Sequence, residues 1–280
     1  MSEFEAGLAT PVGDTSVPVK RILGRNPGPM TGPGTNSYLI GRDRLCLLDP
    51  GPRDDIQLES FMQAIGDACL EYILITHTHP DHSPAALKLQ QLTGAKLVGL
   101  PAPPVAGHDQ TFAPERQWQD GEIIDCDEYS VQLLHTPGHV SNHICYLLIE
   151  ERMLFTGDHV LQGTTSVILP PDGDMGAYLN SLQRLQGLGL RALAPGHGDI
   201  MHEPEVEIAG LIAHRLKREQ KVIAGLVTLG RCNLEQLVSI VYDDVAAHLI
   251  PWAKKTLLAH LIKLERDDVL TVVDDFWQLK

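Results

Sequence analysis

The stretch ILITHTHPDHS, residues 73–83, decides the fold of this chain. Its apolar start predicts a short buried strand over residues 72–76. Four side chains that can bind metal follow within six positions: His77, His79, Asp81 and His82. Residues two apart on an extended chain point the same way, so His77 and His79 can hold one ion while the next turn directs Asp81 and His82 to another. The stretch therefore predicts two neighbouring metal sites.

Three later segments have the same build, in which a strand end runs into a glycine-containing turn that carries a ligand-type residue. They are LLHTPGH with His139, LFTGDH with Asp158, and LAPGHG with His197. Glycine lets the backbone turn sharply and come close to an ion. One such histidine alone is more often a turn cap or a satisfied core group, but seven ligand-type residues together favour a dinuclear centre. Imidazole and carboxylate suit zinc, iron and manganese, so we expect two divalent ions, with zinc favoured.

Outward from these motifs, strands fall into two groups. Turn residues 41–43 join strand segments 37–40 and 44–49 as in a hairpin. Helices are expected over residues 57–68 and from Ser83 to Gly94, with a strand at 96–100. Further short strands are expected at 122–125, 130–134, 144–149 and 153–156. A helix is expected at 177–188 and a last strand at 191–194. This order predicts an α/β fold of two sheets with helices outside, αββα.

The last part of the chain changes to helices. Helices are expected over residues 205–228, 233–242 and 251–265, followed by a short hairpin, an order that resembles a winged helix. We therefore expect two domains, a catalytic domain over residues 1–204 and a winged-helix-like helical domain over residues 205–280. The tail is expected to pack or to dimerise, which allows a homodimer as a partner state.

The composition restricts the class of protein, its expected location and its expected partners. The 280 residues are 43% hydrophobic, which is ordinary for a globular protein. No apolar run approaches the length of a bilayer span and the first residues lack a secretory pattern, so we expect a cytoplasmic protein without a membrane partner. The five cysteines contain no Cys-x-x-Cys pair and are expected to be reduced core residues. A net charge of −14 repels polyanions, which counts against a nuclease without excluding one.

Taken together, THTHPDH, TPGH, FTGD and PGHG resemble the motifs of the metallo-beta-lactamase superfamily, in order, across about residues 20–200. The resemblance implies the αββα fold and a supporting role for Asp49. It also implies one metal at His77, His79 and His139, a second at Asp81, His82 and His197, and Asp158 as the bridge. A bridging aspartate is more typical of the hydrolase branches around glyoxalase II than of antibiotic-destroying lactamases. His79 stands where the oxygen- and nitric-oxide-reducing relatives carry glutamate, which also favours hydrolysis.

A closer resemblance lies in RILGRNPGPMTGPGTNSYLIG, residues 21–41, and in AHRLKRE, residues 213–219, with the tail behind it. These segments look like the beta-lactamase-like protein 2 family. That family includes a single-strand endoribonuclease and thioesterases that act on carrier-bound polyketides. One departure is HSPAA, residues 82–86, where the superfamily usually has a small residue and two glycines after the histidine. Ser83 and Pro84 are expected to start the helix there, with an altered surrounding of the site.

The expected chemistry is hydrolysis by a hydroxide that bridges the two metals, with Asp81 as the catalytic residue that orients it. His143 is a candidate to contact substrate or to give a proton to the leaving group, with a structural role as the alternative. His214, in a cationic cluster with Arg215 and Arg218, is a second candidate for substrate binding, with a solvated helix face as the alternative.

Three functions stay open. The favoured one is hydrolysis of a small-molecule acyl substrate, a (thio)ester, lactone or related compound. The alternative is a single-strand endoribonuclease with RNA as partner, and weak beta-lactamase activity is compatible with either. A non-catalytic nucleic-acid-binding module is disfavoured, because such a module has no use for seven converging ligands.

Overall fold

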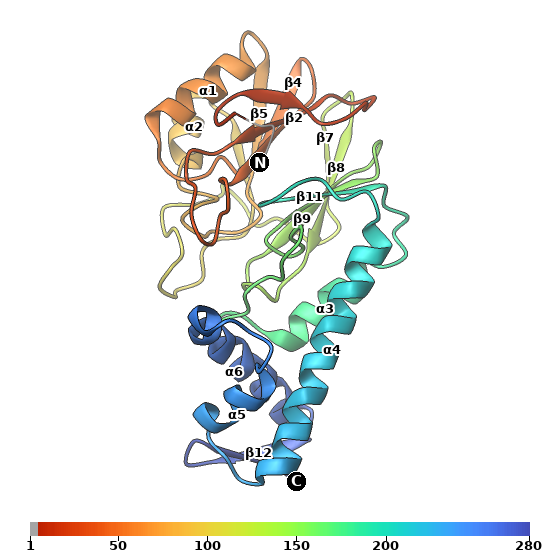
Figure 1. Ribbon diagram of the computed structural model, residues 1–280. Coiled ribbons are helices and arrows are strands. Elements are labelled where there is room, and N and C mark those ends of the chain that lie inside the picture. The colour runs from red at the N-terminus through yellow and green to blue at the C-terminus, as the bar shows by residue number, and fades with distance from the viewer. Residues whose placement is uncertain (1–4) are drawn as a thin grey trace. The chain divides into compact units, whose positions relative to one another are not determined.

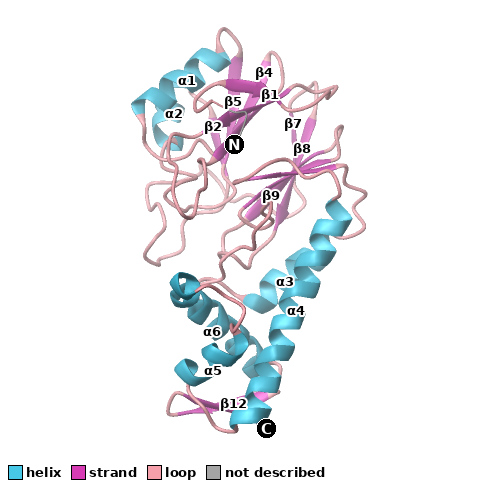
Figure 2. Cartoon of the chain, viewed as in Figure 1, coloured by secondary structure: helices cyan, strands magenta, loops and turns pink. Residues whose placement is uncertain are grey.

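The computed structural model describes residues 5–280, which divide into two compact units. Of the described residues, the first unit takes 5–136, Asn142–Thr165 and Gly187–Pro204, and the second takes Pro137–Ser141, Ser166–Gln186 and Glu205–Lys280. Strands dominate the first unit and helices the second (Figure 2). The division into domains after residue 204 stays a prediction, since the second unit also includes two earlier segments.

The first unit contains a six-stranded sheet. Its strands, in spatial order, are β1 (Ala9–Pro11), β2 (Val19–Leu23), β3 (Asn36–Ile40), β4 (Arg44–Leu48), β5 (Cys69–Leu74) and β6 (Lys96–Val98). The predicted hairpin is confirmed, because β3 and β4 pair antiparallel with Tyr38 opposite Leu48. From β4 to β6 the pairing is parallel, which requires a crossover between strands. Helices α1 (Asp55–Ile65) and α2 (Ala86–Thr93) supply these crossovers.

A five-stranded sheet completes the first unit. Its spatial order is β11 (Ala192–Pro195), β10 (Met153–Gly157), β9 (Ile144–Leu148), β8 (Ser130–His135) and β7 (Ile123–Asp125). Pairing is antiparallel from β7 to β10 and parallel between β10 and β11. Both predicted groups of strands are therefore present, in the order that the sequence analysis expects.

Two apolar cores stabilise the first unit. Inward side chains of both sheets meet in one of them, where the rings of Tyr38 and Phe155 lie 5.0 Å apart between centroids. On the other face of the first sheet, Leu58 and Phe61 of α1 pack against Leu47 and Ile73. Figure 1 shows α1 and α2 side by side on that sheet. Burial of such residues, worth about 1.5–3 kcal/mol for each large apolar side chain, fixes the strand register.

The second unit has its own core. It contains α3 (Met175–Leu185), α4 (Pro204–Leu229), α5 (Leu234–Val241), the short helix η1 (Ala247–Leu249), α6 (Ile250–Arg266) and the antiparallel hairpin β12 (Leu270–Val273) and β13 (Phe276–Leu279). Asn233 and Gln236 form a capping box that starts α5. Leu226, Leu237, Leu257 and Trp277 are among the side chains that close the core. The predicted winged-helix order is confirmed in α5, α6 and the hairpin.

The predicted bounds of three helices are wrong: α1 ends at Ile65 rather than at residue 68, α3 spans Met175–Leu185 rather than 177–188, and α2 starts late. Helix α2 begins at Ala86 rather than at Ser83, and Ala85 caps it without a side-chain hydrogen bond. Ser83 instead directs its hydroxyl to the carboxylate of Asp109, 2.8 Å away. Across residues 5–280, every helix is either too short or too polar to span a bilayer.

Candidate metal centre

Strand ends bring the ligand-type residues together. Asp49 follows β4, and the stretch with His77 follows the parallel neighbour β5. In the second sheet Asp158 follows β10, and His197 follows its parallel neighbour β11. Parallel strands end at the same edge of a sheet, so each pair delivers its ligands to one place. His139 lies in the loop between β8 and β9.

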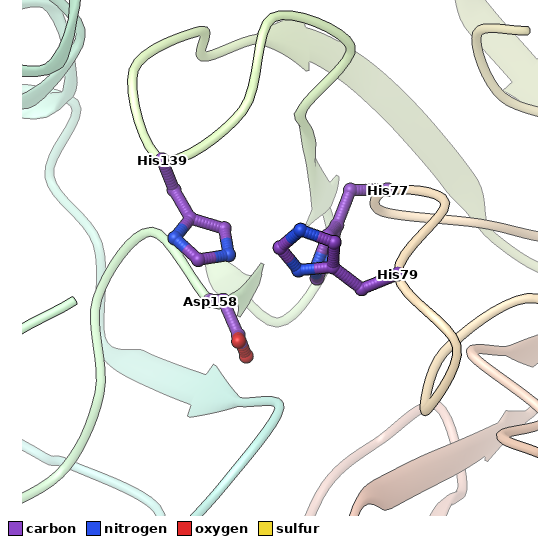
Figure 3. A group of neighbouring side chains, drawn as sticks. All are labelled: His77, His79, His139 and Asp158. Carbon is purple, nitrogen blue, oxygen red and sulfur yellow. The ribbon is translucent and has the colours of Figure 1, made fainter. Parts of the chain in front are cut away.

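The first group of ligand atoms comes from His77, His79, His139 and Asp158, and these atoms lie within 4.8 Å of one another. Figure 3 shows the three imidazoles and the carboxylate pointing toward one another. Nε2 of His77 and Nδ1 of His79 are 3.0 Å apart. This is the convergence of donors that a metal ion requires.

Asp81, His82 and His197 form the second group, also within 4.8 Å. Oδ2 of Asp81 lies 3.4 Å from Nε2 of His82 and 3.2 Å from Nε2 of His197. Asp158 reaches this group too, because its Oδ1 lies 3.4 Å from each of the same two nitrogens. Ligands about 2.0–2.2 Å from a tetrahedral ion are roughly 3.3–3.6 Å apart. The His/Asp cluster is thus capable of binding metal, and Asp158 touches both groups.

Hydrogen bonds on the far side of the rings fix which nitrogen faces the cluster. Nδ1 of His77 lies 3.0 Å from the Thr76 hydroxyl, and Nδ1 of His82 lies 2.9 Å from Oδ2 of Asp49. For His139 and His197, the hydrogen-bond partner of Nδ1 is a backbone carbonyl oxygen. Such partners orient metal-binding imidazoles and set their tautomer. Asp49 also accepts hydrogen bonds from the Thr76 N–H and hydroxyl, which agrees with the supporting role that the family resemblance implies.

In this cluster, carboxylates lie close to imidazoles, and each kind of group shifts the pKa of the other. Burial lowers the pKa of His82, but the carboxylates of Asp81, Asp158 and Asp49 more than offset it, so this pKa lies well above its ordinary value. For Asp81, burial raises the pKa, yet the neighbouring His82 and His197 hold it well below its usual range. A buried site with this many carboxylates favours a cation.

The two predicted substrate contacts lie in different surroundings. His143 is completely buried, with Nδ1 2.9 Å from the Thr136 hydroxyl and its ring 5.3 Å from that of His77. This position favours a supporting role behind His77, so a contact with substrate stays a prediction. His214 lies on α4, where partial burial and the guanidinium of Arg215 lower its pKa. Its substrate role also stays a prediction.

Several groups near the centre are not among the residues predicted from the sequence. The ring of His108 lies 5.0 Å from that of His79, and the buried His159 lies 5.6 Å from His143. Asn142, also buried, donates to the hydroxyl of Thr78. The THTHPDH motif points to none of them, because they come from other loops. His159 follows Asp158 directly and is the one that the motif LFTGDH contains.

Comparison with known proteins agrees with this geometry. Residues 30–197, with all seven predicted ligands among them, match the profile of the metallo-beta-lactamase superfamily. The chain belongs to the metallo-beta-lactamase superfamily. It is a hydrolase of that superfamily, and residues 234–277 match the beta-lactamase associated winged helix domain. The predicted family, the αββα fold and the winged helix are therefore confirmed.

Relatives in this superfamily cover most of the chain. The beta-lactamase-like protein 2 homolog of Drosophila melanogaster is 32% identical over 273 residues, which span 91% of this chain and 90% of that protein. An atrochrysone carboxyl ACP thioesterase of Aspergillus chevalieri is 34% identical over 263 residues, 89% of this chain and 81% of that protein. Among solved structures, a beta-lactamase domain protein from Burkholderia ambifaria superposes with a TM-score of 0.81 at 18% identity, covering 100% of this chain and 96% of that one. The last likeness shows the metallo-beta-lactamase fold.

Proposed function

We propose that this metallo-beta-lactamase hydrolase holds two divalent ions, preferably zinc, and cleaves small (thio)esters, lactones or related acyl compounds. The observation that carries the proposal is the position of Asp158, whose carboxylate contacts the histidines of the second group while it also belongs to the first. One carboxylate shared by two donor groups suits a dinuclear site. The ligand roles of the seven residues follow from that arrangement.

Two divalent ions, when bound, lower the pKa of a shared water and polarise the electrophile. The residues of the chain orient the reactants. Asp81 is the proposed catalytic residue, because its carboxylate contacts His82 and His197 and its side chain stays 26% exposed. It can therefore accept a hydrogen bond from the attacking water. Thr35 lies on its other side, with the hydroxyl 3.5 Å from Oδ2.

Charge supports an acyl substrate over RNA. The chain carries a net charge of −14, whereas a nucleic-acid-binding surface needs cations to contact phosphates. In the tail, most cations that could serve are occupied by acidic partners. Arg218, Lys221, Lys254 and Lys263 form ion pairs with Asp244, Asp243, Glu235 and Glu219. The similarity to thioesterases supports the same choice.

The test is turnover by purified, zinc-loaded protein on a panel of thioesters, lactones and a chromogenic lactam beside single-stranded RNA. Asp158→Ala removes the shared carboxylate, and Asp67→Ala is its control at an exposed position outside the site. We expect acyl turnover that falls at least about a hundredfold in Asp158→Ala and persists in Asp67→Ala. RNA cleavage that is lost in Asp158→Ala, without acyl turnover, would instead make the ribonuclease function the correct one.

A further inference from the structure

The loop that follows β6 is hydrogen-bonded to residues 73–83, the ligand stretch, which contains His77, His79, Asp81 and His82. The backbone N–H of Asp109 donates to the carbonyl oxygen of Thr78, 2.7 Å away, and the Ser83 hydroxyl donates to Oδ2 of Asp109, 2.8 Å away. Asn142 donates to the Thr78 hydroxyl at 2.8 Å and to the carbonyl oxygen of Pro101 at 3.1 Å. Residues 100–108 form the proline-rich loop. One end of the loop is therefore held through Asn142 and the other through Asp109, and both of these residues bond to Thr78, which lies between His77 and His79.

His108 ends this loop next to the metal centre. Its Nδ1 lies 2.8 Å from the hydroxyl of Thr78, the residue between His77 and His79. Its ring lies 5.0 Å from the ring of His79, and both side chains are partly exposed. The loop therefore approaches the centre on a side that solvent reaches.

The chemistry of the loop is apolar. Residues 100–107 read LPAPPVAG and contain neither a charged nor a hydroxyl side chain, while Ala106 at the turn is exposed. The backbone is held in shape, because the side chain of Gln110 and the N–H of Val105 both donate to the carbonyl oxygen of Pro103. Proline also lowers the entropy that such a segment loses on binding. A rigid apolar surface of this kind suits an aliphatic or aromatic group.

We propose that the proline-rich loop binds the acyl group of the substrate, and that His108 is the positioning residue that holds it beside the metal centre. This inference rests on the proposed function and narrows it to thioesters of apolar acyl groups. A dicarboxylic acyl group is disfavoured, because residues 100–107 carry no cation that could bind its free carboxylate. A phosphodiester backbone is disfavoured for the same reason.

The test compares acetyl, hexanoyl, benzoyl and succinyl thioesters of N-acetylcysteamine with the full-length, zinc-loaded protein. We expect kcat/KM for hexanoyl and benzoyl to exceed that for acetyl and succinyl by at least about tenfold, since even one methylene in an apolar site can change the rate that much. Ala106→Asp places a charge on the loop and should remove this preference, because kcat/KM for the hexanoyl and benzoyl thioesters falls toward that for the acetyl thioester. Ala113→Asp, beyond the buried Phe112, is the matched control and should keep the preference.

The role of His108 is tested by rescue. His108→Ala removes the hydrogen bond to Thr78 and should raise KM for the hexanoyl thioester about tenfold with little change in kcat. His108→Asn can still bond to the Thr78 hydroxyl and should restore most of the preference. Zinc content, measured by mass spectrometry of the metal, should stay the same in all four variants, which separates loss of the loop from loss of the centre.

The outcomes are distinguishable. Equal turnover of all four thioesters, or an equal effect of Ala106→Asp and Ala113→Asp on the acyl preference, would overturn the inference and leave the proposed function standing. Absence of turnover on every thioester and lactone would overturn the proposed function and the inference with it.

Discussion

Oδ2 of Asp49 lies 2.9 Å from Nδ1 of His82, and both side chains are fully buried. The same carboxylate accepts hydrogen bonds from the N–H and the hydroxyl of Thr76, the residue before the first ligand. Asp49 has a φ of 46°, a strained conformation for a residue other than glycine. The strand end is therefore bent so that one carboxylate orients His82 and anchors the ligand stretch.

We expect Asp49→Asn to weaken metal binding about 10- to 100-fold, the range found when a carboxylate behind a metal-binding histidine is replaced. The amide keeps the volume of the carboxylate but loses its charge and one acceptor. Zinc affinity should be measured by competition with a chromogenic chelator. Asp67→Asn, at an exposed position, is the control. An unchanged affinity in Asp49→Asn would show that Asp49 only shapes the strand end.

Removal of metal should destabilise the folded protein. A ligand that binds only the folded state adds about 2.7 kcal/mol when its concentration is a hundred times its Kd. Differential scanning calorimetry of chelator-treated protein should show a lower Tm, and added zinc should restore it. In Asp158→Ala, zinc should raise the Tm less than in wild type, because both donor groups lose a member. Equal zinc-dependent shifts in the two proteins would place Asp158 outside the metal centre.

A side chain at Gly157 would clash with the residues that lie behind the candidate ligands. It has a φ of 47°, and a Cβ there would lie 2.7 Å from Cβ of Thr76 and 2.8 Å from Nε2 of His143. Gly163 also has a positive φ, 71°, but a Cβ there meets nothing within 4 Å. Gly157→Ala should therefore cost about 1–3 kcal/mol more than Gly163→Ala, the usual range for an overpacked site. Urea unfolding of both variants measures the difference, and equal losses would contradict the expected clash.

His260 of α6 should make the protein less stable in mild acid. It is completely buried, and burial lowers its pKa; Glu219 opposes this effect, and Arg215 and Lys263 add to it. Below the ordinary pKa of 6.5 the unfolded chain takes up a proton that the folded chain refuses, so stability falls with pH there. Replacement His260→Leu removes the group.

Urea unfolding of wild type and His260→Leu at pH 7.5 and 5.5 tests this. The free energy of unfolding of wild type should fall more than that of the variant between the two pH values. Groups away from His260 titrate equally in both proteins and cancel in the comparison, whereas the pKa values of Glu219 and His214 also respond to His260 and belong to the same effect. A difference between the two proteins that is the same at both pH values would show that His260 has its ordinary pKa when folded.

Much of the fold could be predicted from sequence, because its signals are local. The apolar run before THTHPDH predicts β5, and turn residues 41–43 predict the β3–β4 hairpin, both of which the structure contains. Strand β2 was not predicted, since Lys20 and Arg21 interrupt its apolar pattern. Arg21 is nevertheless buried, because it donates to the carbonyl oxygen of Gly198 and to Asp199, far along the chain.

The ligand-type residues could be predicted for the same reason, since each stands in its own short motif at a strand end. The place of His108 could not. It follows His82 by 26 positions, in a loop without periodicity. Its approach to His79 depends on the contact between its Nδ1 and the Thr78 hydroxyl and on the hydrogen bond from Ser83 to the neighbouring Asp109, which no spacing rule predicts. Ser83 is predicted to start a helix but instead contacts Asp109. This contact comes from the serine of HSPAA, the segment that departs from the superfamily pattern.

The candidate ligands of the second group come from two sheets, Asp81 and His82 from the loop after β5 and His197 from the loop after β11. A growing chain reaches His197 more than a hundred positions after His82, so a partly synthesised chain lacks the means to hold that ion tightly. Tight binding of an ion by this group would require both sheets to be in place. Metal uptake would then follow the formation of both sheets rather than guide the folding of the first.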